Sequence, residues 1–244
     1  MLQAVDVCKS FKTFLAVDHL NLEVTPGQVV GLLGPNGAGK TTTLRCLCGI
    51  LHPNHGYIKI NGFDLKTEAS KAKQGLAFVP EVPALYDLLT VLEHLRFIAM
   101  CFSRLETFDS MGETLLRRYD LWEKRNDLVG TLSKGMRQKL TVACALIHDA
   151  NVFLFDEPMI GIDPSGVHQF KQELVTLKEN GAAILISTHL LDTAERLCDR
   201  VVIMAKGKMV ASGTMDELRS IPGMEGRSLE DVFLALTETN KQAV

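Results

Sequence analysis

A glycine-rich segment between an apolar run and a helical pattern constrains this chain more than any other feature of its sequence. The apolar run at residues 29–33 ends where the segment begins, and a helix is expected over residues 39–49. The segment fits the pattern GxxxxGK[ST], which predicts a phosphate-binding loop when a strand precedes it and a helix follows it. The pattern covers Gly34, Pro35, Asn36, Gly37, Ala38, Gly39, Lys40 and Thr41, and Thr42 directly after it is a further candidate for binding the nucleotide.

The residue types in this loop suit the binding of a nucleotide. Glycines let successive backbone N–H groups turn inward around phosphate oxygens, and the start of a helix directs its positive dipole end at the same anion. Lys40 supplies a charge for the β- and γ-phosphates, and Thr41 supplies a hydroxyl ligand for Mg²⁺. A glycine-rich turn that binds nothing is the alternative, and the strand and helix around the loop disfavour it.

A second candidate site is the acidic end of an apolar run at residues 152–157, Val-Phe-Leu-Phe-Asp-Glu. A strand this apolar is buried on both faces, so its acids emerge at the carboxyl edge of a parallel sheet, where ligands bind in open α/β folds. We expect Asp156 to hold the Mg²⁺ shell and Glu157 to polarise the water that attacks the γ-phosphate. The alternative is a solvated turn that carries two acids.

Alternating strand and helix patterns predict an α/β fold with a mostly parallel sheet. Two early strands, at 3–7 and 15–24, predict an antiparallel side sheet. Further strands are expected at 29–33, 57–60, 76–79, 152–155, 183–187 and 201–204, and further helices at 133–148, 164–179, 189–198, 215–219 and 229–236.

From about residue 83 to residue 130 the period of the apolar residues changes to that of a helix. Leu85, Leu88, Leu89, Leu92 and Leu95 recur at helical spacing, which predicts an inserted helical lobe. We therefore expect one domain over 1–244, with a core at 1–82 and 131–220, the lobe at 83–130 and a short helical segment at 221–244.

The composition excludes several classes of protein. The 244 residues are 46% hydrophobic and 23% charged, which is ordinary for a globular protein and excludes a disordered or low-complexity chain. With 26 basic and 29 acidic residues the net charge is −3, so a nucleic-acid partner is not expected. We find no secretory signal and no apolar run of about 18 residues that would span a membrane. The six cysteines lack a CxxC pair or metal-ligand spacing, which favours reduced thiols in a cytosolic protein.

Three further motifs follow in order along the chain. Leu132-Ser-Lys-Gly-Met136 is similar to the signature LSGGQ, Gly161-Ile-Asp-Pro164 to a D-loop, and His189 to a switch histidine. Together with the loop and the acidic strand end, these make five motifs in the order found in the ATP-binding subunits of ABC transporters. The chain resembles that family over nearly its whole length.

The resemblance implies a P-loop NTPase fold that binds ATP and Mg²⁺ and hydrolyses the nucleotide. Catalytic roles then fall to Lys40, Glu157 and His189, with His189 orienting Glu157. Ser133, Gly135 and Asp163 would act on the nucleotide of a second ATPase subunit, so a complete site needs two copies or a homologue. For each of the last three motifs a plain helix N-cap is the alternative.

The resemblance also implies an aromatic side chain that stacks on adenine, and Phe11 fits this position, with Phe14 as the rival candidate. Two features depart from the family pattern. Glu81 stands where the family usually has glutamine, and we expect it to serve as a third Mg²⁺ ligand. The signature has Lys134 and Met136 in place of glycine and glutamine.

The function implied is ATP hydrolysis that powers a separate membrane-spanning permease subunit. The Pro-Glu junction at 80–81, the signature and the segment Ser-Leu-Glu-Asp-Val-Phe at 228–233 favour an exporter. The partner would bind near residues 81–95, with Leu85 and Tyr86 as contacts, and would hold the chain on the inner face of the cell membrane. Two alternatives stay open: a soluble ATPase that remodels a protein or nucleic-acid assembly, and a regulatory subunit that does not hydrolyse ATP.

Overall fold

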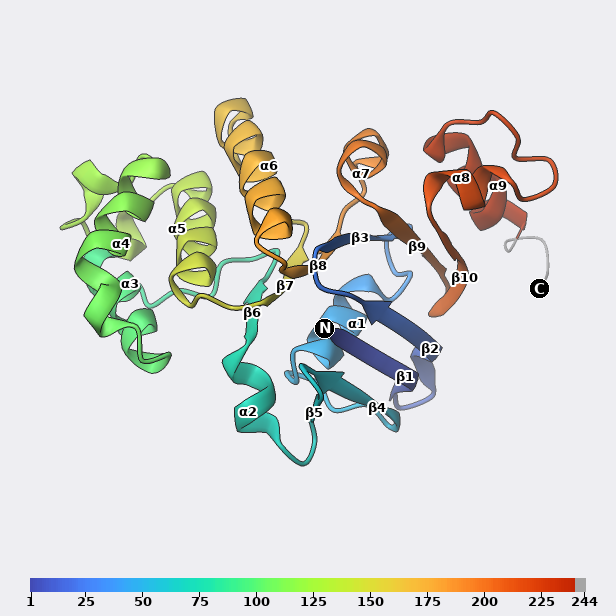
Figure 1. Ribbon diagram of the computed structural model, residues 1–244, viewed down its shortest axis with the longest axis horizontal. Coiled ribbons are helices and arrows are strands. Elements are labelled where there is room, and N and C mark those ends of the chain that lie inside the picture. The colour runs from blue at the N-terminus through green and yellow to red at the C-terminus, as the bar shows by residue number, and fades with distance from the viewer. Residues whose placement is uncertain (240–244) are drawn as a thin grey trace.

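The computed structural model describes residues 1–239, and within this range the strands form two sheets (Figure 1). The larger sheet has the strand order β10-β9-β3-β8-β7-β6. The five strands from β9 to β6 are parallel to one another, and β10 at the other edge runs antiparallel to β9. This confirms the predicted α/β fold with a mostly parallel sheet. The strands are β3 (Gln28–Leu33), β6 (Leu76–Val79), β7 (Val152–Asp156), β8 (Ala183–Ser187), β9 (Arg200–Ala205) and β10 (Lys208–Gly213).

The smaller sheet is the antiparallel side sheet that the N-terminal pattern predicts. Its order is β2-β1-β4-β5, and every pairing in it is antiparallel. The strands are longer than expected because the alternation of buried and exposed residues continues beyond the most apolar stretch. They are β1 (Leu2–Phe11), β2 (Phe14–Val24), β4 (His55–Ile60) and β5 (Phe63–Asp64).

Helix α1 (Lys40–Leu47) joins the two sheets into one core. Its buried Leu44 and Leu47 pack in a cluster with side chains from both sheets, among them Leu20 of β2 and Leu32 of β3. A second apolar cluster lies where α6 (Pro164–Glu179) and the helical lobe cover the parallel sheet. Burial of this much apolar surface fixes α1, and with it the loop that precedes it.

The helical lobe contains α3 (Val91–Cys101), α4 (Leu105–Arg118) and two short 3-10 turns, and α5 (Lys134–Ile147) packs on both α3 and α4 (Figure 1). The expected helical run through Leu85, Leu88 and Leu89 is wrong, because α3 begins only at Val91. Thr90 caps the helix and Glu93 completes a capping box, so the chain before Thr90 is not helical.

The remaining elements pack around the two sheets. Helix α2 (Ala69–Gln74) and strands β5 and β10 are not in the sequence prediction. Helix α7 (Leu191–Leu197) begins two residues later than expected, and α8 (Met215–Arg219) and α9 (Leu229–Thr239) follow it.

The predicted division of the chain at residues 83, 130 and 221 stays a prediction about domain organisation, and its last part, 240–244, lies outside the described residues. Among the helices of residues 1–239, none combines the length and the apolar character needed to cross a membrane.

Candidate nucleotide-binding site

The glycine-rich loop connects β3 to α1, as the sequence predicts. Two of its glycines are required by close backbone approach. A Cβ atom on Gly39, whose φ is 104°, would lie 2.3 Å from the carbonyl oxygen of Ala16, and one on Gly34 would lie 2.6 Å from that of Met204. Any larger residue would push the loop away from the β2 and β9 backbones that hold it.

Helix α1 begins without a side-chain cap. Gly39 occupies the N-cap position, and no side chain accepts a hydrogen bond from the first turn. The first N–H groups of the helix are therefore available for an anion, and they add to the positive end of the helix dipole.

Lys40 lies within the curve of the loop. Its side chain is 8% exposed, and its Nζ donates to the carbonyl oxygens of Gly34 at 2.7 Å and Pro35 at 3.3 Å. These contacts hold the ammonium group beside the backbone N–H groups that the loop presents. Lys40 thus forms part of one cationic cradle with the start of α1.

The acidic pair lies at the end of β7, which pairs directly with β8. Asp156 is 2% exposed, and its Oδ1 accepts a hydrogen bond from Ser187 Oγ at 2.6 Å. The register explains this contact, because Asp156 and Ser187 are direct partners in the parallel pairing of β7 and β8. The same Ser187 Oγ lies 3.1 Å from the backbone N–H of Glu157, so this hydroxyl ties together the backbone and side chain of the pair.

Glu157 turns away from the strand into the site. Its φ is 47°, in the left-handed region that a residue with a side chain rarely adopts. Its Oε2 lies 2.9 Å from Nδ1 of His189, which follows β8 by two residues. Because β7 and β8 end at the same sheet edge, residues 32 positions apart in the chain meet there.

A cavity of about 620 Å³ lies over the loop. Both Glu157 and His189 line it, and Glu81 reaches it from the segment after β6. Its lining is Phe14, Ala16, Gly34, Pro35, Asn36, Gly37, Ala38, Gly39, Lys40, Thr41, Thr42, Glu81, Glu157, Ile160, Thr188, His189, Leu191 and Phe233. The structure thus places the whole predicted loop, the predicted base and the predicted switch histidine around one space.

The two aromatic candidates differ in their position relative to this cavity. Phe14, at the start of β2, is 62% exposed and lines it. Phe11 is also exposed, but it is not among the lining residues, and the ammonium group of Lys9 lies 5.3 Å from the centre of its ring. The geometry therefore does not support Phe11 as the stacking residue and favours its rival, Phe14.

The three residues expected to serve a second subunit do not line this cavity. Ser133 caps α5 and accepts a hydrogen bond from the N–H of Met136 at 3.3 Å. Asp163 caps α6 through the N–H of Gly166 at 3.2 Å. Both N-cap roles are thus present, and both side chains are also exposed enough to meet another molecule.

The starts of α5 and α6 are fastened to each other. A Cβ atom on Gly135 would lie 2.8 Å from the carbonyl oxygen of Gly161, so only glycine allows this approach. Lys139 of α5 lies 3.0 Å from Asp163, and the hydrogen bond from this lysine lowers the pKa of Asp163. The signature-like and D-loop-like segments therefore form one surface.

Several residues of the site are absent from the sequence prediction. Ser187 forms hydrogen bonds with both residues of the acidic pair. It is a polar residue at the end of the apolar strand β8, and that position could have indicated it in the sequence. Thr188, Ile160 and Leu191 lie next to predicted residues and come to the cavity by proximity. Phe233 comes from α9, far along the chain, and the pattern at 228–233 carries no sign of this contact.

Comparison with known proteins shows the family of this chain. The model of the ABC transporter family matches residues 17–160. The ABC-type transporter ATP-binding protein EcsA of Bacillus subtilis is 34% identical over 239 residues, which cover 98% of this chain and 97% of EcsA. The Nod factor export ATP-binding protein I of Burkholderia pseudomallei is 40% identical over 206 residues, which cover 84% of this chain and 68% of that protein.

A solved structure described as the ATP-binding subunit of an ABC transporter superposes with a TM-score of 0.93 at 35% identity. The match covers 97% of this chain and 99% of the other. The shared fold therefore includes both sheets and the helical lobe.

Proposed function

We propose that this chain, which belongs to the ABC transporter family as an ATP-binding subunit and hydrolyses ATP, powers a separate membrane-spanning partner that exports its substrate. The observation that carries the proposal is the Glu157–His189 pair at the edge of the loop cavity, because it unites a base with the group that orients it. The export role rests on the likeness to a Nod factor export protein and on the segment at 228–233.

In the proposed hydrolysis the loop binds the phosphates and Glu157 activates the water. Lys40 and the first N–H groups of α1 neutralise charge on the β- and γ-phosphates. Glu157 accepts a proton from a water molecule as its oxygen attacks the γ-phosphorus, and ADP leaves with the bridging oxygen. His189 holds Glu157 by the contact at 2.9 Å, which fixes the carboxylate toward the cavity.

The residues around the acidic pair suit Mg²⁺, which prefers carboxylate and hydroxyl oxygen ligands. Asp156 is a buried carboxylate, and within residues 1–239 no cationic side chain forms an ion pair with it. A buried carboxylate without a cation is costly, so a divalent ion beside it offsets that cost. Asp156 and Thr41 would hold the ion, with Glu81 as a further ligand. When bound there, Mg²⁺ would reduce the negative charge on the β- and γ-phosphates.

The base of the nucleotide is expected to stack on Phe14. Replacing Phe14 with alanine is expected to weaken ATP binding about tenfold, ~1.4 kcal/mol, because the aromatic face is lost. Phe11→Ala is the matched control and is expected to leave the affinity within about twofold. Equilibrium titration with a fluorescent ATP analogue measures both. If Phe11→Ala weakened binding and Phe14→Ala did not, the sequence-based choice would be restored.

The permease is expected to bind at a groove between the parallel sheet and the helical lobe. A second cavity, of about 470 Å³, lies there, and Val82, Leu85 and Phe102 are among its lining. Beside it Leu88 is 88% exposed, and Tyr86 is exposed while its ring packs edge-on against Phe97 at 5.5 Å. Exposed apolar side chains next to an apolar hollow are typical of a protein interface.

Leu88→Glu is expected to abolish co-purification of the chain with its membrane partner from detergent-solubilised membranes. The charge enters an apolar contact, while the nucleotide site is untouched, so ATP binding by the isolated chain is retained. Val175→Glu places the same charge on an exposed apolar position of α6 and serves as the control. If both the unmodified chain and Leu88→Glu stayed in the soluble fraction with a soluble partner, the result would instead support the alternative function, an ATPase that remodels a protein or nucleic-acid assembly.

A further inference from the structure

Two strained residues face each other on the side sheet, and neither belongs to the sites described above. The pairing of β1 with β2 is irregular between Ala4 and Val7 and again between Val7 and Lys9. At this place Asp6 has a φ of 53° and His19 a φ of 48°, both in the left-handed region. Each costs about 1 kcal/mol or more, and bulges of this kind commonly turn a side chain toward a functional site.

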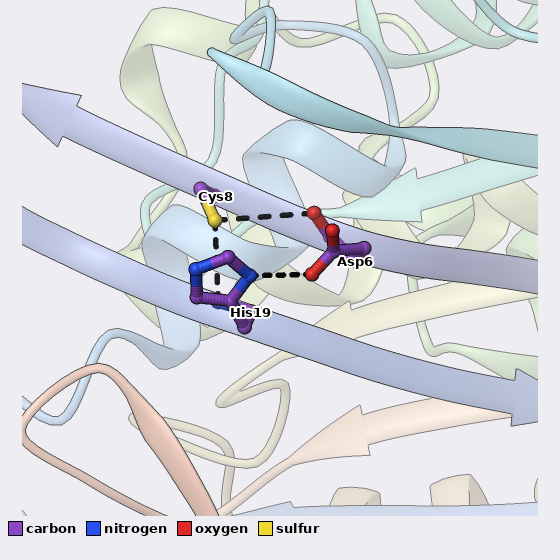
Figure 2. Close-up of side chains that lie close together, drawn as sticks. All are labelled: Asp6, Cys8 and His19. Atoms are coloured by element: carbon purple, nitrogen blue, oxygen red, sulfur yellow. Dashed lines mark hydrogen bonds and ion pairs between the residues drawn. The ribbon is translucent and has the colours of Figure 1, made fainter.

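The bulges bring three different donor side chains together. Nδ1 of His19 lies 2.5 Å from Oδ1 of Asp6, and Sγ of Cys8 accepts a hydrogen bond from the backbone N–H of His19 at 3.3 Å (Figure 2). One ligand atom from each of the three side chains lies within 4.8 Å of the others. From β4, Nε2 of His55 lies 3.0 Å from the second carboxylate oxygen of Asp6.

We propose that Asp6, Cys8 and His19 bind a divalent transition-metal ion of the Zn²⁺ class, with His55 as the fourth ligand. Carboxylate, thiolate and imidazole are the ligand types of zinc sites, and four of them satisfy its tetrahedral preference. A thiolate and a carboxylate balance the charge of the ion, and two neutral imidazoles add none.

The spacing of the first three ligands requires only small movements. Ligand bonds of about 2.0–2.3 Å place tetrahedral donor atoms roughly 3.3–3.8 Å apart, so the donor atoms of Asp6, Cys8 and His19, which lie within 4.8 Å of one another, need to shift by about an ångström. His55 lies outside this group; its Nε2 is 3.0 Å from the Asp6 carboxylate, and its ring would turn toward the ion to complete the site. The rings of His19 and His55 are mostly exposed, with centres 6.3 Å apart, and they can turn when the ion replaces their contacts with Asp6. Cys8 is nearly buried, so the metal would lie at the surface with its sulfur ligand beneath it.

This site is separate from the nucleotide site. None of the four residues lines the loop cavity, and the oxygen ligands assigned there suit Mg²⁺, whereas a cysteine and two histidines do not. A thiolate-to-metal signal therefore does not come from the nucleotide site.

Titration of the full, reduced, nucleotide-free chain with Co²⁺ tests the proposal, because Co²⁺ takes zinc sites and shows a thiolate-to-metal charge-transfer absorption. We expect one Co²⁺ per chain with that absorption, and its displacement by Zn²⁺. His19→Gln and Asp6→Asn are each expected to lower the affinity for Co²⁺ at least tenfold, and Cys8→Ser to remove the thiolate absorption.

The matched controls are His52→Gln and Cys101→Ser, which change an exposed histidine and an exposed cysteine outside the cluster. Both are expected to bind Co²⁺ as the unmodified chain does. Circular dichroism of each variant checks that it is folded, and the exposed His19 keeps the test valid if Cys8→Ser does not fold. Absence of the thiolate absorption in the unmodified chain, or its survival unchanged in both His19→Gln and Cys8→Ser, would overturn the site.

Discussion

Replacing Glu157 with glutamine is expected to lower the ATPase rate of this protein by about 10²-fold or more while ATP remains bound. Glutamine keeps the shape of the side chain and a hydrogen bond to His189 but accepts no proton from water. Because the bound ATP is not hydrolysed, it should stay in the site and keep two subunits together as a dimer. Phosphate release measures the rate, and gel filtration with ATP and Mg²⁺ measures the trapped dimer.

Glu179→Gln, at the exposed end of α6, is the control for this substitution and should leave turnover unchanged. Removing the ring in His189→Ala should lower turnover in the same direction, because Glu157 then loses the contact that orients it. Turnover in Glu157→Gln equal to that of the unmodified chain would remove Glu157 from the role of base, and a nearby acid such as Glu81 would become the candidate.

Much of the fold and of the site could be predicted because the decisive signals are local in the sequence. The strand before the loop, the glycine pattern and the helix after it are adjacent, so one short segment specifies both the turn and its ligand. Glu157 and His189 each follow an apolar strand. Parallel strands end at a common edge, and this rule alone places the two side chains near each other, as the contact at 2.9 Å shows.

The error in the helical lobe has a local physical cause. Leucines before Thr90 have helical spacing, but the capping box of Thr90 and Glu93 begins the helix after them, and local capping decides over periodicity. The adenine-stacking residue stays a prediction: the family resemblance suggests Phe11, whereas Phe14 lines the cavity. Phe14 is two residues before Ala16, where β2 approaches Gly39 of the loop, and the sequence motif carries no sign of that approach.

The Asp6–Cys8–His19 cluster could not be predicted from the sequence. Spacing rules for cysteine and histidine detect ligands that are close in sequence or repeated, and this chain has neither pattern. Here Asp6 and Cys8 come from β1 and His19 from β2, the proposed fourth ligand His55 comes from β4, and the bulges beside them alter the pairing register. No periodicity in the sequence predicts where such a bulge falls, so only the folded sheet reveals the cluster.

The last prediction tests whether the surface formed by the starts of α5 and α6 completes the site of a second subunit. A chain with Ser133→Arg should bind ATP in its own loop but fail to close on a partner's nucleotide, and Lys40→Ala should lose at least tenfold in ATP affinity, about 1.4 kcal/mol. Neither homodimer should turn over. Mixed together, they form a heterodimer with one doubly altered site and one intact site, which should recover part of the activity.

Ser133→Asp separates the two roles of this side chain. Aspartate caps a helix as well as serine does, so α5 and its hydrogen bond to Met136 should persist. Its negative charge, however, would face the γ-phosphate of the partner's ATP and oppose closure. The measurements are ATP binding, ATP-dependent dimerisation and turnover, made on the assembled complex with its membrane partner. Full dimerisation and turnover in both Ser133→Asp and Ser133→Arg would leave Ser133 as a helix cap only, and the composite site would lose its signature contact.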